Sequence, residues 1–192
     1  MPHRLFRFVT AVVCAGLASL VLASFAAAYS LGPYPGSPVT IPATGTGSPY
    51  PSNFDLGSAR GKLTGMTVQV NLSHTFTADI DLLLVGPDGT GVLLMSDVCG
   101  SQATSGLDLT FSDTAPSGLP DTATCSSGTF RPTDFSGGSN TPEAFPAPAP
   151  STWASSLSAF NGIDPTGPWN LYAVDDAPSD QGAVNSWSIT FD

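Results

Sequence analysis

The sequence predicts an all-β protein, either a sandwich or a barrel. Several short segments alternate apolar and polar residues with a period of two, and clusters of Gly, Pro, Asn and Asp separate them. The segment Ile80–Val85 is almost uninterruptedly apolar and is bounded by turn residues, which is typical of a strand buried on both faces. After residue 28 no segment has the 3.6-residue periodicity of a three-turn helix.

Residues 1–28 have the features of a secretory signal peptide. Arg4 and Arg7 supply a positive start, Val9–Phe25 is apolar, and Ala26–Ala28 offers small residues for cleavage. A retained membrane anchor is the alternative, because the apolar run approaches the ~20 residues that span a bilayer. We expect cleavage, since small residues end the run and a Pro/Gly-rich segment follows. The sequence therefore predicts a secreted, extracellular protein with no membrane contact after cleavage.

The charge of the mature chain narrows the range of its partners. Cleavage leaves 192 − 28 = 164 residues, which is enough for one domain. Three basic residues remain against 15 acidic ones, so the net charge is 3 − 15 = −12. Nucleic acids and anionic membranes are excluded as partners because they carry the same sign of charge. Metal cations are compatible with it.

Two cysteines, Cys99 and Cys125, remain in the mature chain. In an exported protein the simplest expectation for such a pair is one disulfide. Closing a loop of this length stabilises a fold by ~3 kcal/mol in the chain-entropy description.

The first half of the mature chain leads into a central hairpin. Residues 29–52 predict an extended, Pro/Gly/Ser-rich leader with one edge strand, Val39–Ile41, and the domain proper is expected over residues 53–192. Leu63–Leu72 alternates as a half-buried strand. Ile80–Val85 and Val92–Met95 predict a β-hairpin. In its Gly86–Gly89 turn Pro87 presets φ, Asp88 bonds its own backbone, and Gly89 takes positive φ.

The second half contains one long irregular segment between clear strands. Leu107–Ser112 alternates as a half-exposed strand, and residues 113–150 follow without regular periodicity, so the disulfide is the expected tether. Residues 151–160 fit one helical turn or a short strand equally well. Residues 169–174 predict a strand apolar on both faces, and residues 186–191 a closing strand, with Trp169 and Trp187 in the core.

Three segments resemble the P domain, also called Homo B, of kexin- and furin-like proprotein convertases. They are HTFTADIDLLLVGPDGT (residues 74–90), NGIDPTGPWNLYAVDD (161–176) and GAVNSWSITF (182–191). The resemblance implies a jelly-roll-like antiparallel β-sandwich, galactose-binding-like in class. It also implies a stability partner for a subtilisin-like serine endopeptidase rather than the catalyst. No protease domain separates the signal peptide from this module, and its Pro/Gly-rich insertion is longer than in the convertases.

We predict no catalytic residues. His74 is the one histidine of the mature chain, so any Ser-His-Asp triad would have to use it. The sequence also lacks the G-x-S-x-G motif of a nucleophile elbow. We expect His74 to hydrogen-bond the backbone or a hydroxyl at the start of the central strand.

Metal binding is the stronger chemical prediction. Asp79 and Asp81 are two residues apart, so a strand would point both carboxylates to one face. Other aspartates end the neighbouring strands or cluster in the turn before the last strand, and oxygen ligands of this kind suit Ca²⁺. The alternative is a set of solvated turn residues. The candidate ligands are Asp79, Asp81, Asp97, Asp113, Asp175, Asp176 and Asp180.

Three functions therefore remain open. The first is a secreted, non-catalytic stability or binding module with a Ca²⁺ site. The second is an accessory domain of a subtilisin-like protease system. The third is a carbohydrate or cell-surface adhesion module, in which Trp153 beside the FPAPAP tract would contact the ligand.

Overall fold

The computed structural model describes residues 30–59, 61–135 and 143–192, so the expected signal peptide lies outside the described residues. The described chain is almost entirely β, which confirms the all-β prediction. Its strands are β1 (Leu31–Gly36), β2 (Val39–Ile41), β3 (Gly45–Thr46), β4 (Ser52–Leu56), β5 (Met66–His74), β6 (Ile80–Val85), β7 (Gly91–Ser96), β8 (Thr104–Phe111), β9 (Gly128–Phe130), β10 (Thr133–Asp134), β11 (Gly167–Asp175) and β12 (Gly182–Phe191). Two short 3₁₀ helices, η1 (Thr77–Asp79) and η2 (Leu157–Phe160), join them.

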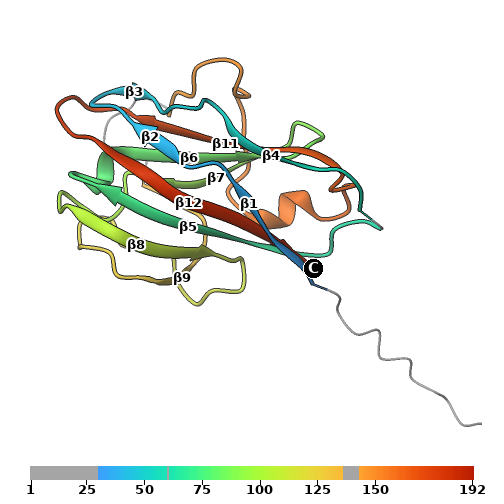
Figure 1. The fold of residues 1–192 in the computed structure, drawn as a ribbon. Helices are drawn as coiled ribbons and strands as arrows, with labels where there is room; N and C mark the ends of the chain where they lie inside the picture. Colours follow the sequence, from blue (N-terminus) through green and yellow to red (C-terminus); the bar gives the residue numbers. More distant parts are fainter. Residues whose placement is uncertain (1–29, 60, 136–142) are drawn as a thin grey trace, which may run out of the picture.

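The strands form two sheets packed face to face (Figure 1). The first sheet has the order β1-β12-β5-β8-β9, with β2 also paired to β12. The second has the order β10-β7-β6-β11-β3, with β4 also paired to β11. Alternate residues of the first sheet point inward, as the buried Val68, Val70 and Leu72 of β5 show. They meet the inner face of the second sheet in one apolar core that contains Trp169 and Trp187.

The β6–β7 hairpin lies at the centre of the second sheet, as the sequence predicts. Every residue of both strands is buried. In the turn, the Thr90 amide donates to the Asp88 carboxylate at 3.0 Å, and Gly89 has φ +86°. The turn residues therefore act as the sequence predicts, and they fix the register of the hairpin.

The outer face of the second sheet is covered by residues 143–154, which we call the Pro-rich segment, and this explains why β6 is apolar on both sides. Leu83 and Val85 form a second apolar cluster there with Phe145 and Tyr172, and Trp153 packs against it. The segment is held by backbone hydrogen bonds to β7: the Ala154 amide donates to the Gly91 carbonyl at 2.9 Å, and Leu93 donates to Ala154 at 3.0 Å. Residues 143–154 of the insertion are therefore a packed layer of the fold.

Two sequence expectations are wrong in detail. The leader contains β1 and β3 in addition to β2, and all three pair with strands of the main sheets. The many prolines of the leader argue against strands in a sequence analysis, because Pro cannot donate a ladder hydrogen bond. Edge strands nevertheless tolerate Pro. The sheets are also not purely antiparallel, because β9 pairs with β8 and β10 with β7 in parallel.

The disulfide prediction is confirmed. Cys99 and Cys125 are bonded, with their Cα atoms 4.9 Å apart. Cys99 also donates its amide to the Pro120 carbonyl at 2.8 Å. The bridge thus ties the start of the irregular segment to the turn after β7.

Candidate functional site

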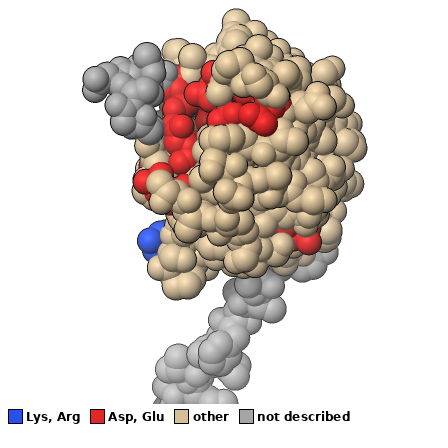
Figure 2. All heavy atoms as spheres, turned by 90° about the vertical axis from the view of Figure 1, so that its left-hand side faces the viewer, with Lys and Arg blue, Asp and Glu red and all other residues tan. Residues whose placement is uncertain are grey.

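One end of the sandwich gathers most of the predicted acidic ligands. The end of β11, the β11–β12 turn, η1 and the residue after β7 meet there. Figure 2 views this end and shows carboxylate side chains forming a band across its face. The pairing of Asp175 with Ile80 aligns the end of β11 with the start of β6. The Asp176 amide donates to the Asp79 carbonyl at 3.1 Å, which brings the β11–β12 turn against η1.

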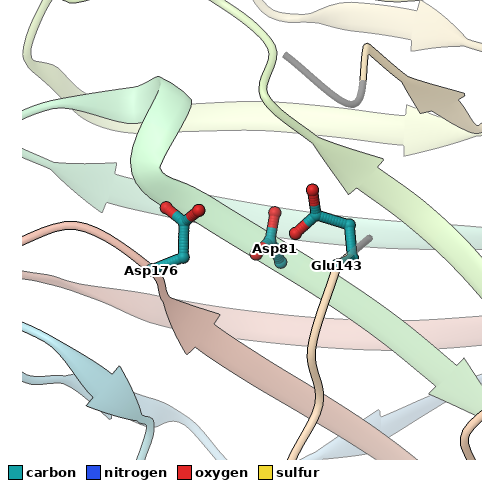
Figure 3. A group of neighbouring side chains, drawn as sticks. All are labelled: Asp81, Glu143 and Asp176. Carbon is teal, nitrogen blue, oxygen red and sulfur yellow. The ribbon is translucent and has the colours of Figure 1, made fainter. Parts of the chain in front are cut away.

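Three carboxylates converge at the centre of this acidic end. Asp81 lies on β6, Asp176 follows β11, and Glu143 comes from the Pro-rich segment (Figure 3). One oxygen of each lies within 4.8 Å of the others. Asp81 is 2% exposed, whereas Glu143 is half-buried and Asp176 is exposed. We call these three residues the acidic triad.

The protonation of the triad follows from its burial. Burial raises the pKa of Asp81 far above its ordinary value, and the hydrogen bond to Glu143 and that residue's charge add to the effect. Burial also raises the pKa of Glu143, with a further contribution from Asp97. The Ser96 side chain hydrogen-bonds both carboxyl groups and lowers the pKa of each. Without a cation, burial therefore favours the protonated forms of Asp81 and Glu143.

The neighbouring aspartates extend the acidic field around the triad. Burial raises the pKa of Asp79 to about 6, and the charges of Asp175, Asp176 and Asp180 add to the rise. Partial burial of its carboxyl group likewise raises the pKa of Asp176, although the residue as a whole is exposed, and the charges of Asp97 and Asp175 add to the rise. Among the described residues, five carboxyl groups at this end have raised pKa values: Asp79, Asp81, Glu143, Asp175 and Asp176. Burial and mutual repulsion both disfavour the charged forms of these carboxyl groups. Bound protons or a bound cation would offset both effects.

His74 lies beside this end in a buried pair with Asp175. Its Nε2 is 3.2 Å from Asp175 Oδ2, and neither side chain is exposed. Its Nδ1 lies 2.7 Å from the Phe76 carbonyl oxygen, which confirms the predicted backbone contact. Burial raises the pKa of Asp175, while the Ala177 amide and His74 act in the opposite direction. The pair joins the end of β5 to the end of β11.

The strand face that Asp79 was expected to share with Asp81 is wrong, and so is the expected position of Asp113 at the acidic end. Asp79 ends η1 and does not extend β6, so it shares no strand face with Asp81. Asp113 lies at the opposite end of the sandwich, because β8 pairs its start, Thr104, with His74. Both Asp113 oxygens accept hydrogen bonds at the start of η2, from the Leu157 amide at 2.9 Å and the Ser158 amide at 2.7 Å. Asp113 therefore binds the first amides of η2 from a distant segment, alongside the N-cap residue Ser156.

Glu143 is the member of the triad that sequence patterns do not predict. It is the single glutamate of the chain and stands between Pro142 and Ala144 in a segment without periodicity. Nothing in the local pattern places this segment beside β6. The relevant signal is the apolar outer face of β6, which requires a cover and so brings some distant segment close.

Trp153 occupies an intermediate position between core and surface. Its indole ring meets the Phe145 ring edge to face, with centroids 5.3 Å apart, and packs on the outer apolar cluster. It also lines a cleft beside β10. Its predicted role as a ligand contact stays a prediction.

The donor set of the acidic triad fits a hard divalent cation. Carboxylate oxygens are among the ligands that Ca²⁺ prefers, and Ca²⁺ accepts six to eight oxygen ligands in flexible geometry. The described residues at this end include no thiol, because Cys99 is in the disulfide, and the one imidazole is paired with Asp175. Zinc, which favours thiolate and imidazole ligands, fits this set poorly.

Comparisons with known proteins find few similarities. No protein-family model and no curated protein matches the chain. Among solved structures, the serine protease of Aeromonas sobria is similar over 85% of this chain, at 14% sequence identity and a TM-score of 0.42. The chain spans 26% of the length of that protease. At this identity and TM-score the similarity carries no functional argument.

The described residues contain no helix that is both long and apolar enough to cross a membrane.

Proposed function

We propose that this chain is a secreted, non-catalytic β-sandwich module of the P-domain type, and that its acidic end binds Ca²⁺. The observation that carries the proposal is the convergence of Asp81, Glu143 and Asp176, from segments far apart in sequence, around a carboxylate that is 2% exposed. Burying a carboxylate costs several kcal/mol unless a partner compensates it. A cation at the triad supplies that compensation and joins the Pro-rich segment to β6 and β11.

The P-domain assignment is supported by how the motifs of the resemblance lie in the fold. The segments 74–90, 161–176 and 182–191 supply the central hairpin strand, its neighbour β11 and the long strand β12. These elements form the inner walls of the core. The matching residues therefore specify the sandwich itself, which is consistent with a role as a stability or binding module.

The non-catalytic assignment is supported by the position of His74. His74 is 2% exposed, and its two ring nitrogens face the Phe76 carbonyl and the Asp175 carboxylate. A general base needs contact with substrate or with a nucleophile that substrate reaches. His74 serves instead as a buried link between β5 and β11.

The P-domain motifs favour a subtilisin-like serine endopeptidase as the partner, with this chain in an accessory role. This role predicts that the purified chain forms a complex with such a protease and extends its half-life at elevated temperature. Size-exclusion chromatography and residual protease activity measure both effects. A protease whose elution and half-life are unchanged by the chain would contradict this partner and leave Ca²⁺ binding unaffected.

Thermal unfolding tests the Ca²⁺ proposal. Millimolar Ca²⁺ is expected to raise the melting temperature above that in EDTA by about 5–10 °C, because a ligand at ~100 times its Kd stabilises by ~2.7 kcal/mol. Asp81→Asn is expected to abolish the rise. The amide keeps the side-chain size and resembles the protonated carboxyl, so the melting temperature in EDTA should stay close to that of the parent chain.

Asp55→Asn is the matched control, since Asp55 is an exposed aspartate on β4 outside the acidic end. Its response to Ca²⁺ should equal that of the parent chain. Equal melting temperatures in Ca²⁺ and EDTA for the parent chain would contradict the proposal.

A further inference from the structure

A second cleft, which shares no lining residue with the acidic triad, lies between β10 and the segment that leads into η2. Leu93 of β7 is part of its lining, with Asp134 of β10 on one side and Trp153, Ser155, Ser156 and Ser158 on the other. Its volume is about 500 Å³, which lies within the ~300–1,000 Å³ typical of small-molecule sites. We call it the Trp153 cleft.

The walls of the Trp153 cleft are held in place by the fold. Val92 bridges Ala154 in parallel, so the segment that carries Trp153 and Ser155 is attached to β7 as an additional strand-like edge. The edge-to-face contact with Phe145 fixes the indole ring from the other side. A rigid aromatic ring loses little conformational entropy when a ligand stacks on it.

The hydroxyl groups of the cleft are also oriented. Ser156 Oγ donates to Asp113 Oδ2 at 2.7 Å and lies 2.6 Å from Ser158 Oγ. Asp113 thus organises a pair of serine hydroxyls along the cleft, in addition to binding the first amides of η2. Because each hydroxyl has a single proton and Ser156 gives its own to Asp113, Ser158 donates to Ser156, and both oxygens are left to accept hydrogen bonds from a ligand.

The chemistry of the lining selects among ligand classes. The lining includes Asp134 and contains no lysine or arginine among the described residues. Anionic ligands such as phosphates or sulfated sugars are therefore disfavoured. An aromatic ring beside several hydroxyls and a carboxylate matches a neutral sugar, whose C–H face stacks on the ring while its hydroxyls bond the polar groups.

We propose that the Trp153 cleft binds a neutral mono- or disaccharide unit. The Trp153 ring supplies the stacking surface, and Ser155, Ser156, Ser158 and Asp134 supply hydrogen-bonding groups. This site is separate from the acidic triad and does not depend on Ca²⁺.

Saturation-transfer NMR on the full chain in EDTA tests the proposal with neutral hexoses, N-acetylhexosamines and their disaccharides. At least one is expected to bind, and Ser155→Tyr should weaken it at least about tenfold, equivalent to ~1.4 kcal/mol, by filling the cleft. Ser155 is exposed, so this variant is expected to fold. Trp153→Ala should remove binding as well. Ser101→Tyr is the matched control at an exposed serine outside the cleft, and it should bind like the parent chain.

Three results would overturn the proposal. The first is that no neutral saccharide binds at millimolar concentration. The second is that binding survives in a folded Ser155→Tyr chain, which would place the sugar elsewhere. The third is that only a sulfated sugar or a proline-rich peptide binds, which would assign the cleft to a different ligand.

Discussion

At the residue scale, close packing beside the buried His74–Asp175 pair depends on a glycine. Gly182 of β12 pairs directly with His74 of β5. A Cβ atom at Gly182 would lie 2.1 Å from the Ser73 carbonyl oxygen and 2.4 Å from the His74 ring. The requirement is for space rather than for an unusual φ angle. Two central strands of the first sheet therefore approach each other more closely here than any side chain allows.

Gly182→Ala is expected to destabilise the protein by about 2–3 kcal/mol, because β5 or β12 must move to admit the methyl group. The matched control is Gly57→Ala, since Gly57 is exposed and a methyl group added there would meet no atom within 4 Å. That change should cost less than about 0.5 kcal/mol. Chemical denaturation of both variants measures the difference. Equal stabilities would show that the strands have room for a methyl group between them.

At the element scale, the Pro-rich segment is the least predictable part of the structure. Periodicity located β5, the β6–β7 hairpin, β11 and β12, because each buries alternate or successive apolar residues. The same logic fails for residues 143–154, which pack through isolated side chains such as Phe145 and Trp153. Periodicity therefore could not predict that Glu143 lies beside β6. The apolar residues on both faces of β6 indicated only that some segment must cover its outer face.

Phe145→Ala tests whether this segment is a packed layer. Phe145 is 8% exposed and contacts Trp153, so its loss should cost about 3 kcal/mol. The same change at Phe135, which is 40% exposed, should cost less than about 0.5 kcal/mol. Urea unfolding compares the two variants. If Phe145→Ala were as stable as Phe135→Ala, the outer apolar cluster would contribute nothing to folding.

At the scale of the whole molecule, the charge is distributed unevenly. The chain has a net charge of −10. The five carboxyl groups with raised pKa values all lie at one end of the sandwich. The sequence located most members of this group, because aspartates at the ends of adjacent strands meet at one sheet edge. It also assigned Asp113 to the group wrongly, since neither the length nor the direction of β8 was known from periodicity.

The stability of the metal-free protein should fall as pH rises. A carboxyl whose pKa is higher in the folded state binds more protons when folded, so the free energy of unfolding decreases with pH between the two values. For Asp79 that window runs from 3.8 to about 6, and the more deeply buried Asp81 extends it upward. In EDTA the melting temperature is expected to drop by several degrees between about pH 4 and pH 7. A melting temperature that rose over this range would contradict the burial of these carboxyl groups.

The most direct test of Ca²⁺ binding at the acidic triad is a crystal structure of the chain grown with Ca²⁺. We predict one anomalous peak at the acidic end, coordinated at about 2.3–2.6 Å by oxygens of Asp81, Glu143 and Asp176. A well-ordered acidic end without that peak, in crystals grown at millimolar Ca²⁺ and neutral pH, would contradict it.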